Sequence, residues 1–230
     1  MILLYLLAAA CVAVSLVTAM LRNRGLEKGR LACKLAASML FCLIAFLAAA
    51  MRETRLSARA ALMLAALLLG LIGDVLLGLD HFVQDNCQTF IFIVGGVPFF
   101  LGHVLYIWLL LSGEPVHPRL LLLLPLMPLL FLLLQRLKLV SLDKLLLPLM
   151  AYGLVLGAMM LSTLNLALQG GALGRLMLFP GVLFAVSDTS LFLGKFGKEK
   201  LRRVRPVFAY TVMLPYYAAQ ALFALSIVYL

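Results

Sequence analysis

The segment RAALMLAALLLGLIGDVLLGL, residues 59–79, is an apolar run that contains a single carboxylate, Asp74. An α-helix needs about 20 apolar residues to cross the hydrocarbon core of a bilayer, so this run predicts a membrane-spanning helix. A charged side chain near the bilayer centre costs about 2.5–3.5 kcal/mol on insertion. Asp74 therefore needs a reason to be there, and it is a candidate functional residue.

The whole chain, like this run, is rich in hydrophobic residues and poor in charged ones. It has 230 residues, of which 65% are hydrophobic and 12% charged, and its mean hydropathy is +1.15. Soluble domains are about 45–50% apolar and about 25% charged. The runs are rich in Leu and Ala and do not alternate, which disfavours a strand barrel. We therefore expect an all-α membrane protein, a bundle of about eight transmembrane helices in one polytopic domain, 1–230. The predicted spans are 2–21, 31–50, 59–79, 90–111, 120–135, 144–168, 175–194 and 207–229.

The net charge of +10 comes from basic residues in the loops between these runs. The first, third, fifth and seventh loops hold 13 Lys and Arg residues, and the even-numbered loops hold 5. Because cytoplasmic loops are enriched in Lys and Arg, the odd-numbered loops are predicted to be cytoplasmic and both termini non-cytoplasmic. This pattern indicates a multi-pass protein of the cell (inner) membrane, and no nucleic-acid partner is expected.

Three further polar residues lie inside predicted spans. Asp188 occurs in VLFAVSDTSLFLG (182–194), His103 near the middle of the fourth span, and Lys34 near the start of the second. In the predicted topology all three and Asp74 lie in the middle or the cytoplasmic half of the membrane, so we expect one water-accessible cavity that opens toward the cytoplasmic leaflet. The alternative is that each residue only makes a helix–helix hydrogen bond.

Other polar side chains extend this set. Phe99, His103 and Tyr106 are spaced i, i+4 and i+7, so they share one helical face. Tyr152 lies in the sixth span, where membrane anchoring or packing is an alternative role. The last span contains the apolar sequence LPYYAAQAL, whose polar members are Tyr216, Tyr217 and Gln220.

A short internal similarity links the two aspartates. Asp74 occurs in Gly-Asp-x-x-Leu and Asp188 in Ser-Asp-x-x-Leu, 114 residues later. The same offset relates His103 to Tyr217, and Tyr106 to Gln220. Since 114 residues span four predicted helices, the halves 1–115 and 116–230 are predicted to be parallel repeats about an axis normal to the membrane.

The residue types restrict the chemistry. Only one histidine is at membrane depth, so a three-His zinc site is not expected, and a mixed site of Asp74, Asp188 and His103 remains an alternative. No Gly-x-Ser-x-Gly motif supports a serine nucleophile. Two carboxyl groups in a low-dielectric cavity form an acid/base pair if a cation such as Lys34 keeps one of them ionised. Such a pair suits reactions through an oxocarbenium ion, as in glycoside hydrolysis.

At these residues the chain resembles the YhhN/lysoplasmalogenase family of integral membrane proteins. The resemblance rests on an ordered set of motifs along nearly the whole chain: GDVLL at 73–77, G-x-x-x-F-x-x-G-H-x-x-Y at 95–106, Y-G-x-x-x-G-A at 152–158, SDTSL at 187–191 and YYAAQAL at 216–222. Lys34 also matches, although Leu35 stands where the family often has Pro.

The resemblance implies a lysoplasmalogenase. Such an enzyme hydrolyses the vinyl-ether bond of a lysoplasmalogen to a fatty aldehyde and glycerophosphoethanolamine or glycerophosphocholine. Asp74 and Asp188 are the expected catalytic pair, in an order the sequence leaves open. Lys34 is expected to meet the lipid phosphate. The other expected substrate-binding residues are His103, Tyr106, Tyr152, Tyr216, Tyr217 and Gln220.

The expected partners are the lysophospholipid within the bilayer and the surrounding membrane lipids, and no cofactor or metal is expected. The main alternative is a small transporter or proton-coupled carrier with the same aspartates as relay groups. A lipid-binding structural protein is a third interpretation.

Overall fold

The computed structural model describes residues 1–52, 57–142 and 145–230, and within them the regular structure is helical apart from an isolated bridge between Val140 and Gly197. Eight segments of the described chain are long and apolar enough to cross a membrane. This confirms the predicted all-α membrane bundle. Arg55 of the second loop and Lys144, the predicted start of the sixth span, lie outside the described residues.

The first four spans are single helices. They are α1 (Ile2–Asn23), α2 (Glu27–Ala50), α3 (Ala58–Gly78) and α4 (Asp85–Leu111), with the short 3-10 helix η1 (Leu79–Phe82) between the last two. The second half is more interrupted. It consists of α5 (Pro118–Leu121), α6 (Leu126–Arg136), α7 (Leu146–Leu168), α8 (Gly171–Met177), α9 (Pro180–Phe196), η3 (Glu199–Val204), α10 (Arg205–Ser226) and η4 (Ile227–Tyr229).

Two spans are interrupted where the sequence predicts continuous helices. The fifth is broken between α5 and α6, where Pro125 caps the second piece. The seventh starts at Gly171 rather than at 175 and is broken before Pro180, the first residue of α9. Proline lacks a backbone N–H, so it is tolerated in a first helical turn and interrupts the helix that precedes it. The apolar pattern alone could not show either break, because it continues across both.

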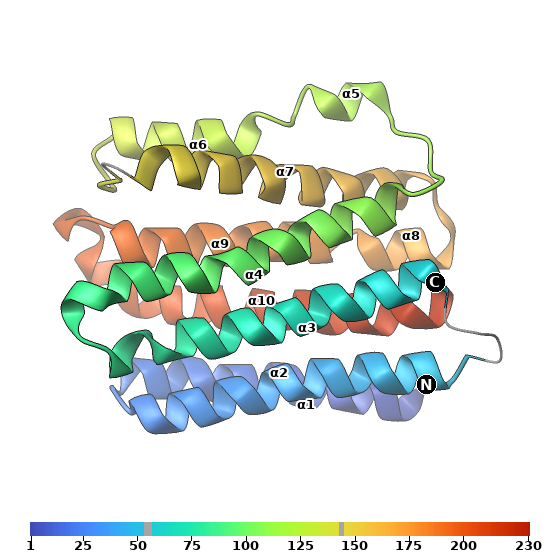
Figure 1. Ribbon diagram of the computed structural model, residues 1–230, viewed down its shortest axis with the longest axis horizontal. Helices are drawn as coiled ribbons and strands as arrows, with labels where there is room; N and C mark the ends of the chain where they lie inside the picture. Colours follow the sequence, from blue (N-terminus) through green and yellow to red (C-terminus); the bar gives the residue numbers. More distant parts are fainter. Residues whose placement is uncertain (53–56, 143–144) are drawn as a thin grey trace.

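The helices run up and down, and both termini lie at the same end of the bundle (Figure 1). The opposite end carries the connections that follow Asn23, Gly78, Arg136 and Phe196, and we call it the odd-loop face. Helix α10 is central and packs against α1, α2 and α9, while α3 packs on α4 and α4 on α7. This arrangement brings polar side chains of α2, α3, α4, α7, α9 and α10 into one interior.

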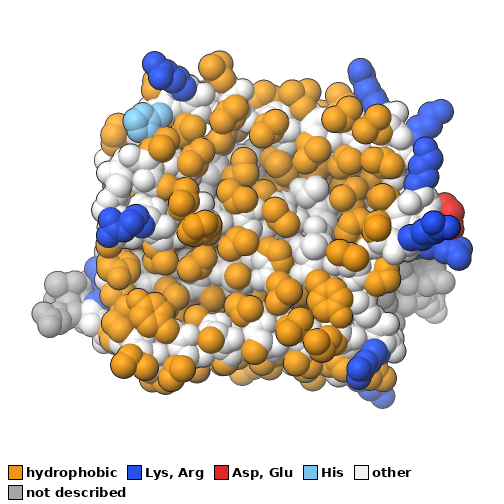
Figure 2. Space-filling model, turned by 180° about the vertical axis from the view of Figure 1, so that it is seen from behind, with side chains coloured by type: hydrophobic (Ala, Val, Ile, Leu, Met, Phe, Trp, Pro, Cys, Tyr) orange, Lys and Arg blue, Asp and Glu red, His pale blue; other side chains and the backbone are white. Residues whose placement is uncertain are grey.

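The outer surface of the bundle is apolar. Figure 2 shows that hydrophobic side chains cover most of one side of the molecule, and that most of the visible Lys and Arg side chains lie toward its two ends. Leu122 and Leu147, for example, are each 79% exposed. A surface of this kind suits lipid rather than water, and the bundle therefore places its buried polar residues at membrane depth.

Candidate active site

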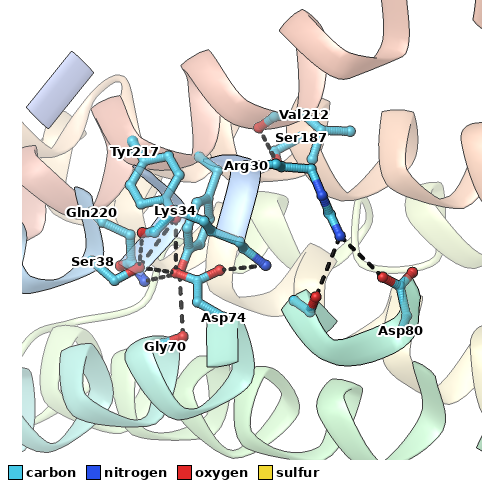
Figure 3. Close-up of polar contacts among 12 residues, drawn as sticks. Arg30, Lys34, Ser38, Gly70, Asp74, Asp80, Ser187, Val212, Tyr217 and Gln220 are labelled. Carbon is cyan, nitrogen blue, oxygen red and sulfur yellow. Dashed lines mark hydrogen bonds and ion pairs between the residues drawn. The ribbon is translucent and has the colours of Figure 1, made fainter. Parts of the chain in front are cut away.

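Asp74 on α3 lies at the centre of a buried polar cluster. Its Oδ1 is 3.1 Å from Lys34 Nζ of α2, and both side chains are buried. Its Oδ2 accepts hydrogen bonds from Ser38 Oγ and from the Tyr216 hydroxyl, each at 2.7 Å (Figure 3). An ammonium group and hydroxyl donors all favour the charged form of a carboxyl group. Asp74 is therefore paired with one cation and held by two hydroxyl donors.

The hydroxyl protons of this cluster can be assigned without conflict. If Ser38 and Tyr216 donate to Asp74, Tyr217 donates to the backbone oxygen of Lys34 at 3.0 Å and lies 3.1 Å from Ser38 Oγ. Every hydroxyl in the cluster then has an acceptor, which a buried polar group requires. The result is a carboxylate held in one orientation.

A chain of hydrogen bonds links Asp74 to α4. Tyr106 donates to Gln220 Oε1 at 2.8 Å, and Gln220 Nε2 donates to the Tyr216 hydroxyl at 3.1 Å. Gly70, one turn before Asp74, makes room for this contact, because a Cβ there would collide with the Gln220 amide. The chain fixes the Tyr216 ring and so fixes one donor of Asp74.

Asp188 on α9 lies in a second cluster of different composition. Its Oδ2 accepts a 2.6 Å hydrogen bond from Tyr152 of α7 and lies 3.3 Å from His103 Nε2 of α4. The same histidine nitrogen is 3.2 Å from the Tyr152 hydroxyl. Among the described residues no Lys or Arg lies within ion-pair distance of Asp188, and its Oδ1 has no hydrogen-bonding partner. This carboxyl group therefore lacks the cation that Asp74 has.

The surroundings of His103 favour one tautomer of its imidazole ring. Its ring is buried and packs edge-on against Phe184, and its Nδ1 has no partner among the described residues. A protonated Nδ1 would be a buried donor without an acceptor, which is costly. We therefore assign the neutral tautomer in which Nε2–H points to Asp188 and Tyr152.

Both aspartates line one cavity of about 630 Å³. Its lining is largely apolar and comes mainly from α4, α9 and α10, with a smaller contribution from α7 that includes Leu149. It reaches the odd-loop face, where its charged lining consists of four basic residues and Asp80. The basic lining residues there are Arg22, Arg30, Lys195 and Arg205. The volume is typical of sites for small organic ligands.

The structure separates the predicted site residues into two groups. Five of them line the cavity: Asp74, Asp188, Lys34, Tyr152 and Tyr216. The other four lie outside the lining and hydrogen-bond to side chains or backbone of these five or to one another: His103, Tyr106, Tyr217 and Gln220. Phe99, His103 and Tyr106 share one buried face of α4, as their spacing predicts.

Sequence reasoning missed Ser38. A serine in an apolar helix usually bonds to its own backbone, and Ser38 also contacts the Lys34 oxygen in this way. Two signals pointed to it: it lies four residues after Lys34, on the same helical face, and 114 residues before Tyr152. The structure places these two hydroxyls in equivalent positions, each bonded to the Oδ2 of one aspartate.

The mixed metal site requires Asp74, Asp188 and His103 to converge. His103 contacts Asp188, whereas Asp74 belongs to the Lys34 cluster, and no three His, Cys, Asp or Glu side chains of the described chain are arranged to hold a metal ion. Ser187, next to Asp188, donates to the Val212 oxygen at 2.9 Å and is not paired with a base (Figure 3). Asp74 and Asp188 thus belong to two separate clusters, each with its own hydroxyl neighbours.

The family model described as the YhhN family matches residues 29–227, which include both aspartates and every residue of the two clusters. No match was found among curated proteins or among solved structures.

Proposed function

Since the chain belongs to the YhhN family, we propose that it is a membrane hydrolase that cleaves the vinyl-ether bond of lysoplasmalogens. One observation carries this proposal: two carboxyl groups in unlike surroundings line the same apolar cavity. Pairs of acidic groups whose environments favour opposite protonation states are typical of acid/base sites. The resemblance to lysoplasmalogenases supplies the substrate.

Asp188 is the proposed general acid. Without a neighbouring Lys or Arg among the described residues, its carboxyl group can hold a proton in the low-dielectric interior. Tyr152 and His103 occupy its Oδ2, which leaves Oδ1 to carry the proton. Tyr152 and His103 are positioning residues in this scheme, because they fix the direction in which Oδ1 points.

Asp74 is the proposed cation stabiliser. It is held ionised by Lys34, and its hydroxyl donors prevent it from turning away from the cavity. A fixed negative charge in a site with little water stabilises a developing positive charge far more than it would in bulk water. A carboxylate with this environment suits an oxocarbenium ion, which carries its positive charge between carbon and oxygen.

The proposed reaction consumes one water molecule. Asp188 donates its proton to the β-carbon of the vinyl ether, and the resulting oxocarbenium ion lies near the Asp74 carboxylate. Water adds to the α-carbon and returns a proton to Asp188, which leaves a hemiacetal. The hemiacetal collapses as its hydroxyl proton passes to the glycerol oxygen, and the C–O bond breaks to give a fatty aldehyde and the glycerophospho-alcohol.

The alkenyl chain has an apolar path out of the cavity. Ile93 and Val97 of α4 line the cavity and are 45% and 51% exposed. Pro148 of α7, on the other side of the path, lines the cavity and is exposed as well. We place the chain between α4 and α7, with its end in the bilayer.

Aldehyde release from defined lysoplasmenyl lipids by purified protein in detergent tests the proposal. Wild type, Asp188→Asn and Asp74→Asn are compared with Glu114→Gln, a control that removes a carboxylate paired with Arg59 away from the cavity. We expect aldehyde from wild type and the control, with and without chelator, and none from the aspartate variants.

Either aspartate variant with full turnover would refute the carboxyl mechanism. A proton-coupled carrier would use the same two groups as relay sites, and it would give gradient-dependent uptake without aldehyde.

A further inference from the structure

The cavity wall carries more positive than negative charge. Five basic and three acidic side chains line it. Two of the basic residues are paired: Lys34 with Asp74, and Arg30 with Asp80 at 3.3 Å. Arg30 also contacts the Gly78 oxygen, so its guanidinium group is held in place (Figure 3).

The other three basic residues have no such partner. Arg22, Lys195 and Arg205 make no ion pair within 4.0 Å among the described residues, and Arg22 has nearby acidic residues, Asp80 and Glu27, with which it interacts electrostatically. Arg205 donates to the Gly197 oxygen at 2.9 Å, and Lys195 Nζ lies 5.6 Å from the centre of the Phe92 ring. Arg22 and Lys195 are only partly exposed. Cations that are partly withdrawn from water and unpaired are costly unless a ligand anion compensates them.

Their position matches one end of a lysophospholipid. Lys195 follows Asp188 by seven residues on α9, so the two residues share a helical face and are about 10 Å apart along the axis. Both side chains lean toward the N-terminus of the helix, and the longer lysine side chain can therefore reach back over part of this distance toward the aspartate. A lysophospholipid has its phosphate and its ether oxygen on the two ends of one glycerol, and this spacing accommodates both.

We propose that Arg22, Lys195 and Arg205 bind the phosphate group of the lysophospholipid at the mouth of the cavity. This inference rests on the proposed function and adds the orientation of the substrate, with its headgroup at the odd-loop face. It assigns the phosphate to residues other than Lys34, whose ammonium group is already engaged by Asp74. Arginine and lysine are both common phosphate ligands, and Arg22 and Lys195 line the same cavity from two different helices, α1 and α9.

Equilibrium binding of a saturated lysolipid separates this inference from catalysis. The probe is 1-O-hexadecyl-glycerophosphoethanolamine, which has the headgroup and ether oxygen but no vinyl bond. Arg22→Gln and Lys195→Gln should each weaken its binding about tenfold, the loss expected for one charge-assisted contact. The control Lys198→Gln removes an exposed charge three residues from Lys195 that does not line the cavity, and it should bind like wild type.

A neutral probe tests whether these changes are specific. Binding of 1-O-hexadecylglycerol, which lacks the phosphate, should be the same in wild type and all variants, and this also shows that the variants fold. Lys195→Arg should retain most of the affinity for the phospholipid. Equal losses for both probes, or no loss for the phospholipid, would overturn the proposal.

Two competition arms identify the source of the phosphate. Glycerophosphoethanolamine should compete only weakly, since it lacks the chain, and inorganic phosphate should compete less still. Inorganic phosphate that displaces the lipid as well as glycerophosphoethanolamine does would overturn the lipid assignment. If no aldehyde forms but lipid binding depends on Arg22 and Lys195, the phosphate site stands and the proposed hydrolysis fails.

Discussion

The two aspartate clusters are built on the same plan and differ in their charge. In each, Oδ2 of the aspartate accepts a hydroxyl, from Ser38 at Asp74 and from Tyr152 at Asp188. Each aspartate also has a contact from a second position, Tyr217 at 3.4 Å and His103 at 3.3 Å. All three pairs of positions are separated by 114 residues. We propose from this correspondence that the halves 1–115 and 116–230 are structural repeats.

The difference lies in two positions. The same offset places Pro148 where the first half has Lys34, and Gly102 where the second half has Tyr216. One cluster therefore has an ammonium group and an additional phenol, and the other has neither. In the proposed mechanism, this is how one scaffold gives one carboxylate and one carboxylic acid.

The largest expected effect is the loss of activity when Asp188 is replaced. Asp188→Asn should lower kcat about 10³-fold, within the range for loss of a general acid. The amide keeps an acceptor for Tyr152, so the thermal unfolding midpoint in detergent should stay near that of wild type. A variant that retains kcat within a few-fold would remove Asp188 from the mechanism.

The Asp74 side should respond differently, in stability as well as activity. Asp74→Asn leaves the buried Lys34 ammonium without its counter-charge, which should cost about 3 kcal/mol of unfolding free energy. The double variant Lys34→Met/Asp74→Asn removes both charges and should recover most of that loss without recovering turnover. Thermal unfolding and aldehyde assays on the three proteins measure this. Equal stability of the single and double variants would show that the ion pair is not the difference between the clusters.

A third experiment makes the two clusters alike. Pro148→Lys introduces a cation at the position equivalent to Lys34, on the cavity wall near Asp188. A nearby positive charge favours the ionised carboxyl, so the activity of Pro148→Lys should be lower than that of wild type and should be lost at a lower pH. Pro148→Gln is the uncharged control. A pH profile that is unchanged in Pro148→Lys alone would contradict the assignment of Asp188 as the acid.

The smallest effect concerns the apolar wall that both clusters share. A Cβ at Gly96 would meet open space, so Gly96→Leu should fold and extend into the proposed path of the chain. We expect kcat/KM to fall about three- to tenfold for long alkenyl chains, as for other single contacts in apolar pockets, and little for short ones. Leu101→Phe enlarges an exposed residue of α4 outside the cavity and is the matched control. Loss that does not depend on chain length would contradict the path between α4 and α7.

Much of the bundle could be predicted from the sequence, because membrane-spanning helices are recognisable as long apolar runs. The sequence also singles out the two aspartates as residues with interior partners, since a charged side chain in such a run needs a partner. The helix breaks before Leu126 and Pro180 were not predictable, because the apolar pattern continues across them.

The partners of each aspartate depend on which helices are neighbours. The spacing of Tyr106 and Gln220 places each residue on a face of its own helix, and only the packing of the bundle shows that they bond to each other. The basic residues at the mouth of the cavity could not be identified from the sequence for a similar reason. The last loop has six Lys and Arg residues, and only the end of α9 and the start of α10 turn two of them, Lys195 and Arg205, toward the cavity.

The proposed binding mode gives the cavity two exits of different polarity, a basic one at the odd-loop face and an apolar one along Ile93, Val97 and Pro148. In the proposed reaction the two products would leave by different exits. The glycerophospho-alcohol would leave into water and the aldehyde into lipid, so the two fragments would enter different phases as soon as the bond breaks. Their separation would oppose recombination, and hydrolysis would be drawn forward by partitioning rather than by any further step on the protein.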